Sequence, residues 1–173
     1  MPDAAAEILA EIKAVFPAQR GVLLSMVNSV LGDEPARVAL AFADKTNWTT
    51  IDPKWLDGVP DGFASALSFL SDEAICFYIP AYLEADMTVG LIQSEPVYHL
   101  VHGFDVRSRH QRIWPNRTET WTDYSVARWS RLTTPQVKAV VHYLDWRASR
   151  DPYDATSISE ALSWFWCKRA SCA

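Results

Sequence analysis

Four prolines in this 173-residue chain stand where helices are expected to start. The pairs are Asp33-Glu34-Pro35, Asp52-Pro53, Ser94-Glu95-Pro96 and Thr134-Pro135. Proline is tolerated in the first turn of a helix, where its missing N–H is not needed, and a preceding Asp, Ser or Thr can cap the open backbone donors. No stretch sustains the apolar–polar alternation that a half-buried strand shows. The chain is therefore predicted to be all-α.

The longest helix signal covers about residues 72–87 and is predicted to be the centre of one compact multi-helix domain. Ser71 can cap this helix, and acidic residues follow it where the helix dipole favours them. Pro80 lies inside the segment, so we expect a bend or a restart there. The apolar stripe of the helix has helical spacing and consists of Ile75, Ile79 and Tyr82.

Asp86 falls on the same face as that stripe, four residues after Tyr82. A buried carboxylate with a raised pKa could act as a general acid or base. It could equally be a structural group, paired with an arginine or hydrogen-bonded by a tyrosine or tryptophan, because a buried charge needs partners. We favour the structural role and expect Asp86 to be mostly buried.

Further helices are predicted at residues 3–16, 22–31, 136–148 and 156–169, which completes a single helical domain over residues 1–173. The exception is a connection at about residues 103–132, where helical periodicity is lost. This connection is rich in arginine and aromatic residues, among them Arg107, Arg109, Arg112, Trp114, Arg117, Trp121, Tyr124, Arg128, Trp129 and Arg131. Long connections without periodicity are often functional.

The segment Leu67-Ser68-Phe69-Leu70-Ser71-Asp72-Glu73-Ala74, followed by Phe77-Tyr78-Ile79-Pro80-Ala81-Tyr82-Leu83 and Asp86, resembles the signature of a bacterial family of uncharacterised proteins. Weaker signals of that family match at Trp48, Ile51-Asp52, Gln136, Ala161-Leu162 and Trp166. The family has no established activity. The resemblance implies a bacterial, soluble, helical protein and no particular chemistry.

Composition excludes several classes of protein. No apolar run approaches the 18 residues that a membrane span needs, and the acidic N-terminus is unlike a signal peptide. The three cysteines Cys76, Cys167 and Cys172 have no metal-ligand spacing, which favours a reduced, cytoplasmic setting. Motifs for a serine nucleophile or a phosphate loop are missing, and Cys76 lies in a hydrophobic helix where thiols are usually inert.

His99 and His102 are three residues apart on an expected helix, with Glu95 and Asp105 nearby in sequence. Imidazoles at this spacing share a face and could bind a divalent metal with one carboxylate. The spacing lacks the His-Glu-x-x-His pattern that would supply a general base. Ordinary partly buried histidines are the simpler interpretation, and we predict no cofactor.

The Arg/Trp-rich connection has a composition that single-stranded nucleic-acid sites use. Residues 1–104 hold 5 basic and 14 acidic side chains, whereas residues 105–150 hold 9 basic and 4 acidic ones. The whole chain nevertheless has a net charge of −5 and no recognised nucleic-acid motif. We therefore favour tryptophans that pin the connection to the core over nucleic-acid binding.

Two tryptophans point away from the apolar stripes of their helices. On helical phase, Trp146 lies opposite the stripe of residues 136–148, and Trp164 lies off the stripe of residues 156–169. Either the Arg/Trp-rich connection covers these rings or a second chain does. Aromatic and arginine side chains are enriched at interface hot spots. An interaction surface is therefore predicted at Trp146, Trp164, Arg112, Trp114 and Trp121.

These observations favour a non-catalytic protein that binds another macromolecule. The expected partner is another protein or a second copy of this chain as a homodimer, and we expect no membrane contact. The alternative is a small metal-dependent or acid/base enzyme that uses His99, His102 and Asp86.

Overall fold

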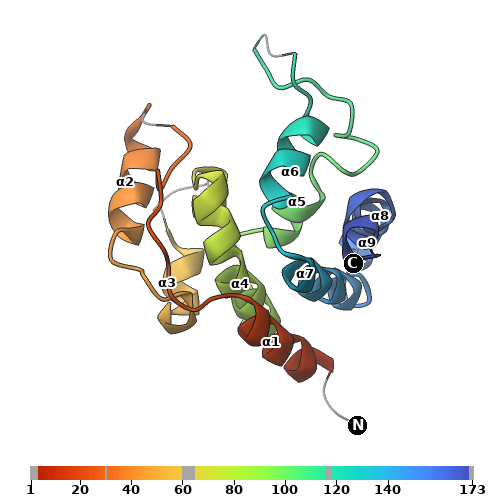
Figure 1. Cartoon of the computed structure of the whole chain (residues 1–173), viewed down its shortest axis with the longest axis horizontal. Coiled ribbons are helices and arrows are strands. Elements are labelled where there is room, and N and C mark those ends of the chain that lie inside the picture. Colours follow the sequence, from red (N-terminus) through yellow and green to blue (C-terminus); the bar gives the residue numbers. More distant parts are fainter. Residues whose placement is uncertain (1–3, 30, 60–64, 116–117, 172–173) are drawn as a thin grey trace. The chain divides into compact units, whose positions relative to one another are not determined.

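The computed structural model describes residues 4–29, 31–59, 65–115 and 118–171. In these ranges the regular structure is helical, with isolated β-bridges and no extended strand, so the all-α prediction is confirmed (Figure 1). The helical elements, with 3-10 and π segments labelled η, are α1 (Ala4–Val15), α2 (Asp33–Phe42), η1 (Trp48–Thr50), α3 (Pro53–Asp57), η2 (Ala66–Ser68), α4 (Asp72–Thr88), α5 (Pro96–Val101), α6 (Trp121–Trp129), α7 (Thr134–Ala148), α8 (Pro152–Ala161), η3 (Leu162–Trp166) and α9 (Cys167–Ser171).

Grouped by their contacts in space, the residues form two compact units. Unit 1 contains residues 1–15 and 97–173, and unit 2 contains residues 16–96. The single domain expected over residues 1–173 stays a prediction. Among the described residues, no helix has the length and apolar character that crossing a membrane requires.

Unit 2 has α4 at its centre, as the longest helix signal predicted. The Ser71 hydroxyl accepts a hydrogen bond from the backbone N–H of Ala74 and so caps the start of α4. From Ala74 to Ala85 most side chains are buried, which leaves α4 apolar on almost every side. The helix is continuous across Pro80, so the expected restart is wrong. Packing on several sides can offset the cost of the bond that proline removes.

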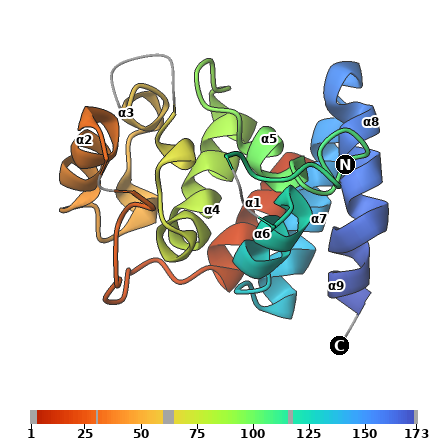
Figure 2. The same cartoon turned by 90° about the horizontal axis from the view of Figure 1, so that it is seen from above.

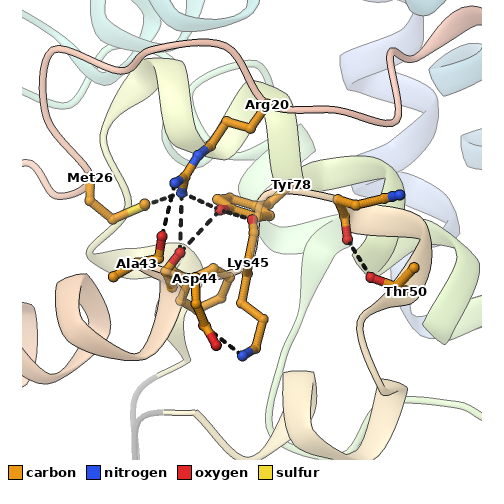
Figure 3. Close-up of polar contacts among 9 residues, drawn as sticks. Arg20, Met26, Ala43, Asp44, Lys45, Thr50 and Tyr78 are labelled. Atoms are coloured by element: carbon orange, nitrogen blue, oxygen red, sulfur yellow. Dashed lines mark hydrogen bonds and ion pairs between the residues drawn. The ribbon is translucent and has the colours of Figure 1, made fainter.

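Arg20 ties three segments of unit 2 together (Figure 3). Its guanidinium donates to the backbone oxygens of Phe42 and Ala43 at 3.1 and 3.0 Å, and to the Tyr78 hydroxyl at 2.7 Å. The Tyr78 hydroxyl in turn donates to the backbone oxygen of Lys45 at 2.6 Å. The cation thus lies on the carbonyl end of α2, where the helix dipole favours positive charge.

The helix expected at residues 22–31 is not formed in the described part of that segment. Its backbone instead pairs with the strand-like stretch before α4. Asn28 N donates to Phe69 O at 2.9 Å, and Ser71 N donates to Met26 O at 3.0 Å. The apolar side chains that suggested a buried helix are partly in solvent, since Val22 and Leu24 are almost fully exposed. Tertiary pairing of the backbone therefore overrides the local apolar pattern.

Unit 1 is organised around α7, which packs against α1, α8 and α9. Figure 2 shows α8, η3 and α9 as one continuous helical rod. The predicted helix at residues 156–169 corresponds to this rod, and its expected inward residues Ile158, Ala161, Leu162 and Phe165 are all buried. The prediction missed two features of the rod: its start at Pro152 and its π-helical middle.

The helix starts confirm the proline part of the signal, since all four prolines lie in the first turn of a helix, namely α2, α3, α5 and α7. The Asp52 carboxylate caps α3 by accepting from Lys54 N, but Gly32 precedes α2 without a side-chain cap, and Thr133 instead of Thr134 precedes α7. A fifth pair, Asp151-Pro152, begins α8, where the Asp151 carboxylate accepts from the N–H of Tyr153 at 2.9 Å. The same rule that predicted the other starts therefore applies at this one too.

The expected connection at residues 103–132 contains a helix of its own, α6. Thr120 and Asp123 form a capping box at its start, in which each side chain accepts from the backbone N–H of the other. Arg128 and Trp129, which looked like loop residues, are buried on this helix. Helical periodicity was not visible in the sequence because the inward face of α6 consists of a serine, an arginine and a tryptophan, and not of aliphatic residues.

Candidate functional site

The rod of unit 1 changes its winding at η3, where a π-helix replaces the α-helix over Leu162–Trp166. Cys167 N donates to Leu162 O, five residues back, as π winding requires. Within this turn Phe165 and Trp166 are buried, whereas the Trp164 side chain is half-buried. π-turns of this kind occur frequently at functional sites.

Phe104, fully buried after α5, positions both the indole of Trp164 and the guanidinium of Arg109. Its ring stacks on Phe165 with centroids 4.2 Å apart, and on Trp164 with centroids 5.9 Å apart. Its backbone oxygen accepts from Nε and Nη2 of Arg109 at 3.2 and 3.1 Å. The guanidinium carbon of Arg109 then lies 5.2 Å from the centroid of the Trp164 ring, a cation–π distance.

Hydrogen bonds and one close backbone approach fix the path of residues 102–109, which lead from α5 to Arg109. Gly103 has a φ of 91°, and a Cβ built on it would lie 2.5 Å from both Ser125 Oγ and Trp121 O of α6. Gly103 N donates to the buried Ser108 hydroxyl at 2.7 Å, and Ser108 N donates to Asp105 Oδ1 at 2.8 Å. Only glycine fits this close approach, so the segment has one well-determined path.

These groups line an open depression of about 330 Å³ on unit 1. Its walls are supplied by the segment after α5 and by one side of the rod: Arg109, Ser159, Glu160, Ser163, Trp164 and Lys168. The ammonium of Lys168 lies 5.9 Å from the Trp164 ring, so two cations flank one indole. Glu160 Oε2 accepts from Val106 N at 2.9 Å and thereby fastens the segment after α5 to the rod. We call this site the Trp164 depression.

Residues 4–170 match a family model described as "Family of unknown function (DUF6714)". The chain belongs to this family. The expectation of an uncharacterised family is thus supported. Searches of curated proteins and of solved structures each found no match.

His99 and His102 lie in an aromatic cluster of this DUF6714 member. The His102 ring stacks on Tyr98 at 4.9 Å and meets the edge of Trp121 at 4.7 Å, and its buried Nε2 has no hydrogen-bond partner among the described residues. Burial lowers the pKa of His99 to about 3, with the charge of Arg128 and then His102 adding to the effect. Burial also lowers the pKa of His102, against the opposing charge of Asp105. Both imidazoles are therefore neutral at pH 7.

No three His, Cys, Asp or Glu side chains in the described ranges are arranged to hold a metal ion. The third residue of the enzyme hypothesis, Asp86, lies on α4 in unit 2, whereas both histidines lie in unit 1. Asp86 is half-buried, not mostly buried as expected, because the burial of α4 declines over its last turn. Its role as a structural carboxylate stays a prediction.

The five residues of the predicted interaction surface lie in different surroundings. Trp164 belongs to the depression, and the other four do not line it. Trp146 is half-buried between Tyr143, at 6.2 Å, and the guanidinium of Arg150, at 4.7 Å. Trp121 is half-buried and belongs to the histidine cluster. The two remaining residues, Arg112 and Trp114, are exposed.

Sequence reasoning missed the partners of Trp164. Lys168 follows it by four residues, a spacing that brings side chains together on a helix, and this could have been noticed. The sequence identified Arg109 only as one of the arginines of the Arg/Trp-rich connection. Its approach to Trp164 depends on the turn at Gly103, and no sequence pattern reveals that turn. Residues 116, 117 and 172, which include Arg117 and Cys172, lie outside the described residues.

Proposed function

We propose that this chain is a non-catalytic protein-interaction module and that the Trp164 depression is its binding surface. The observation that carries the proposal is a half-buried indole flanked by two cations and held from below by Phe104. Tryptophan and arginine are the residue types most enriched in binding hot spots. A ring fixed by packing loses little conformational entropy when a partner covers it.

The chemistry of the depression supports binding over catalysis. The described residues that line it include no histidine and no cysteine, and their one carboxylate, Glu160, accepts from a backbone N–H. A general base must lie within hydrogen-bond reach of the substrate and must have a suitable pKa. The proposal includes a bacterial cytoplasmic setting and a protein partner. The enzyme that uses His99, His102 and Asp86 stays a hypothesis, which metal analysis of the purified protein would test.

A peptide-display selection tests the binding role directly. Random peptides are selected on the wild-type protein and then measured on Trp164→Ala and on Tyr153→Ala, which removes an exposed aromatic ring outside the depression. We expect selected peptides to bind wild type and Tyr153→Ala alike and to lose at least tenfold in affinity on Trp164→Ala, because truncating a hot-spot residue removes about 2 kcal/mol.

Two results would count against this role. One is a selection that yields no saturable binder. The other is a set of binders that tolerate Trp164→Ala, which would place the binding surface elsewhere or nowhere.

A further inference from the structure

The cations of the Trp164 depression are not neutralised by the part of the chain that the structure describes. The exposed ammonium of Lys168 forms no ion pair or hydrogen bond with the described residues. Arg109 uses Nε and Nη2 on Phe104 O, and its Nη1 has no acceptor among the described residues, so it can meet an outside acceptor. A guanidinium has five N–H donors in a fixed fork, so this arrangement keeps donors available without releasing the side chain.

Glu160 offsets only one of these two positive charges. Its Oε2 binds Val106 N at 2.9 Å, and within the described ranges the carboxylate forms no ion pair with Arg109 or Lys168. Among the described residues, the depression therefore holds two cations against one carboxylate and has a local excess of one positive charge. Unit 1 as a whole agrees in sign, with 12 basic and 10 acidic side chains, whereas unit 2 has 4 basic and 11 acidic ones.

We infer that the Trp164 depression takes a carboxylate from an acidic segment of a partner protein. The inference rests on the proposed function and gives its partner a chemistry. A carboxylate is the acceptor that best matches a guanidinium next to an ammonium. The indole of Trp164 offers apolar area to the methylene groups of a glutamate, and the hydroxyls of Ser159 and Ser163 at the edge can bond the peptide backbone.

Other ligands suit the depression less well. A basic segment would meet Arg109 and Lys168 without a free carboxylate to pair with. A nucleic acid would be drawn to the same cations, but it presents a long run of phosphates, and the net charge of unit 1 is only +2. A short acidic segment needs only the local charge that the depression supplies.

The test measures the fluorescence anisotropy of two labelled peptides, hepta-glutamate and hepta-lysine, against the full chain at low salt. Hepta-glutamate is expected to bind saturably and hepta-lysine to bind more weakly. Lys168→Glu reverses one charge at the depression, and it is expected to weaken hepta-glutamate binding about fivefold to tenfold. Trp164→Ala is expected to weaken it as well, and 0.5 M salt should reduce it further through screening.

Lys138→Glu is the matched control, because Lys138 is an exposed lysine of α7 that does not line the depression. It makes the same change in net charge as Lys168→Glu and should leave hepta-glutamate binding within about twofold. An equal loss in both variants would reduce the interaction to overall charge and overturn the inference. Melting temperatures of both variants confirm that the fold is intact.

Two further measurements would identify other occupants of the depression. A labelled oligothymidylate that binds more tightly than hepta-glutamate, and depends on Lys168, would make the site one for nucleic acid. Concentration-dependent sedimentation of wild type that Lys168→Glu abolishes would make the occupant a second copy of this chain. Either outcome overturns the inference.

Failure of the inference and failure of the proposed function look different. Display peptides that depend on Trp164 but contain no Asp or Glu would keep the binding module and refute the acidic partner. A selection without any Trp164-dependent peptide would refute the binding module itself.

Discussion

Trp164 and Trp166 are two residues apart in one π-turn, and they belong to opposite regions of unit 1. Trp166 is fully buried, and its indole N–H donates to Leu100 O of α5 at 2.9 Å. Trp164 is half-buried, and its neighbours above the ring are the cations of Arg109 and Lys168. Both rings contact Phe104, which therefore lies at the boundary between the two regions.

The inner region is fully buried and closely packed. Trp166 lies against Trp129 at 5.7 Å, and the indole N–H of Trp129 donates to His99 O at 3.3 Å. Two consecutive carbonyls of α5 are therefore satisfied by indoles. The outer region has unused donors and a mixed charged lining. The comparison separates the inner tryptophans, which are buried and hydrogen-bonded within unit 1, from the outer one, whose ring is only half-buried.

The largest effect on stability is expected when the inner ring, Trp166, is truncated. Trp166→Ala should lower the free energy of unfolding by about 3–5 kcal/mol, because it leaves a large cavity and strands the Leu100 carbonyl. Chemical denaturation followed by far-UV circular dichroism measures the loss. A loss below about 1 kcal/mol would show that Trp166 is not the centre of a packed region.

The next largest effect is expected at the turn that leads to the outer region. Gly103→Ala should destabilise the protein by about 2–4 kcal/mol, since it adds the cost of a positive φ to a clash with Trp121 O and Ser125 Oγ. The adjacent substitution His102→Gln keeps the backbone conformation and serves as the comparison. Equal melting temperatures for Gly103→Ala and wild type would refute the close approach of α6.

The lowered pKa of His99, a residue of α5 whose carbonyl is bonded by Trp129, also predicts a pH dependence of stability. His99 has a pKa of about 3 in the folded protein against a usual value of 6.5, because burial disfavours its charge. Below pH 6.5 the unfolded chain takes up a proton at His99 that the folded protein refuses, so stability must fall as the pH decreases through this range.

The measurement is the melting temperature at pH 7.5 and at pH 5.5, where carboxylates with ordinary pKa values are still mostly ionised. We expect wild type to lose more stability over this interval than His99→Gln does. The exposed His110 provides the control variant, His110→Gln, which should behave as wild type. A wild-type profile that His99→Gln leaves unaltered would contradict a buried neutral imidazole.

The smallest expected effect is at the outer ring itself. Trp164→Ala should cost roughly 1 kcal/mol, because it removes two partly exposed cation–π contacts and the ring's contact with Phe104, yet opens no enclosed cavity. The same denaturation experiment compares it with Trp166→Ala. A loss as large as that of Trp166→Ala would mean that Trp164 is a core residue, and the binding role would lose its separation from stability.

Much of the fold could be predicted from local rules. Prolines located the helix starts because their effect acts within one turn, and Asp151-Pro152 shows that the rule holds even where it was overlooked. The helix predicted at residues 22–31 rested on an apolar run instead, and it is wrong because the backbone there bonds to Phe69 and Ser71, some 40 residues away. The helix α6 was missed because its inward side chains include an arginine and tryptophans.

The site was less predictable than the fold. Helical phase correctly placed Trp164 off the apolar stripe, although an ideal α-helix was assumed where a π-turn exists. Arg109 reaches Trp164 only through the turn at Gly103 and the carbonyl of Phe104, and both are tertiary features. Residue types alone cannot reveal such an arrangement, because the same arginine could equally have pointed into solvent.

The most direct test of the account is an NMR titration of the indole N–H resonances with hepta-glutamate, each assigned by a Trp→Phe variant. The resonance of Trp164 should shift saturably, while that of Trp166, bonded to Leu100 O, should stay in place. Shifts at both indoles would mean that binding reorganises the core, and no shift at Trp164 would mean that the depression is not the binding surface.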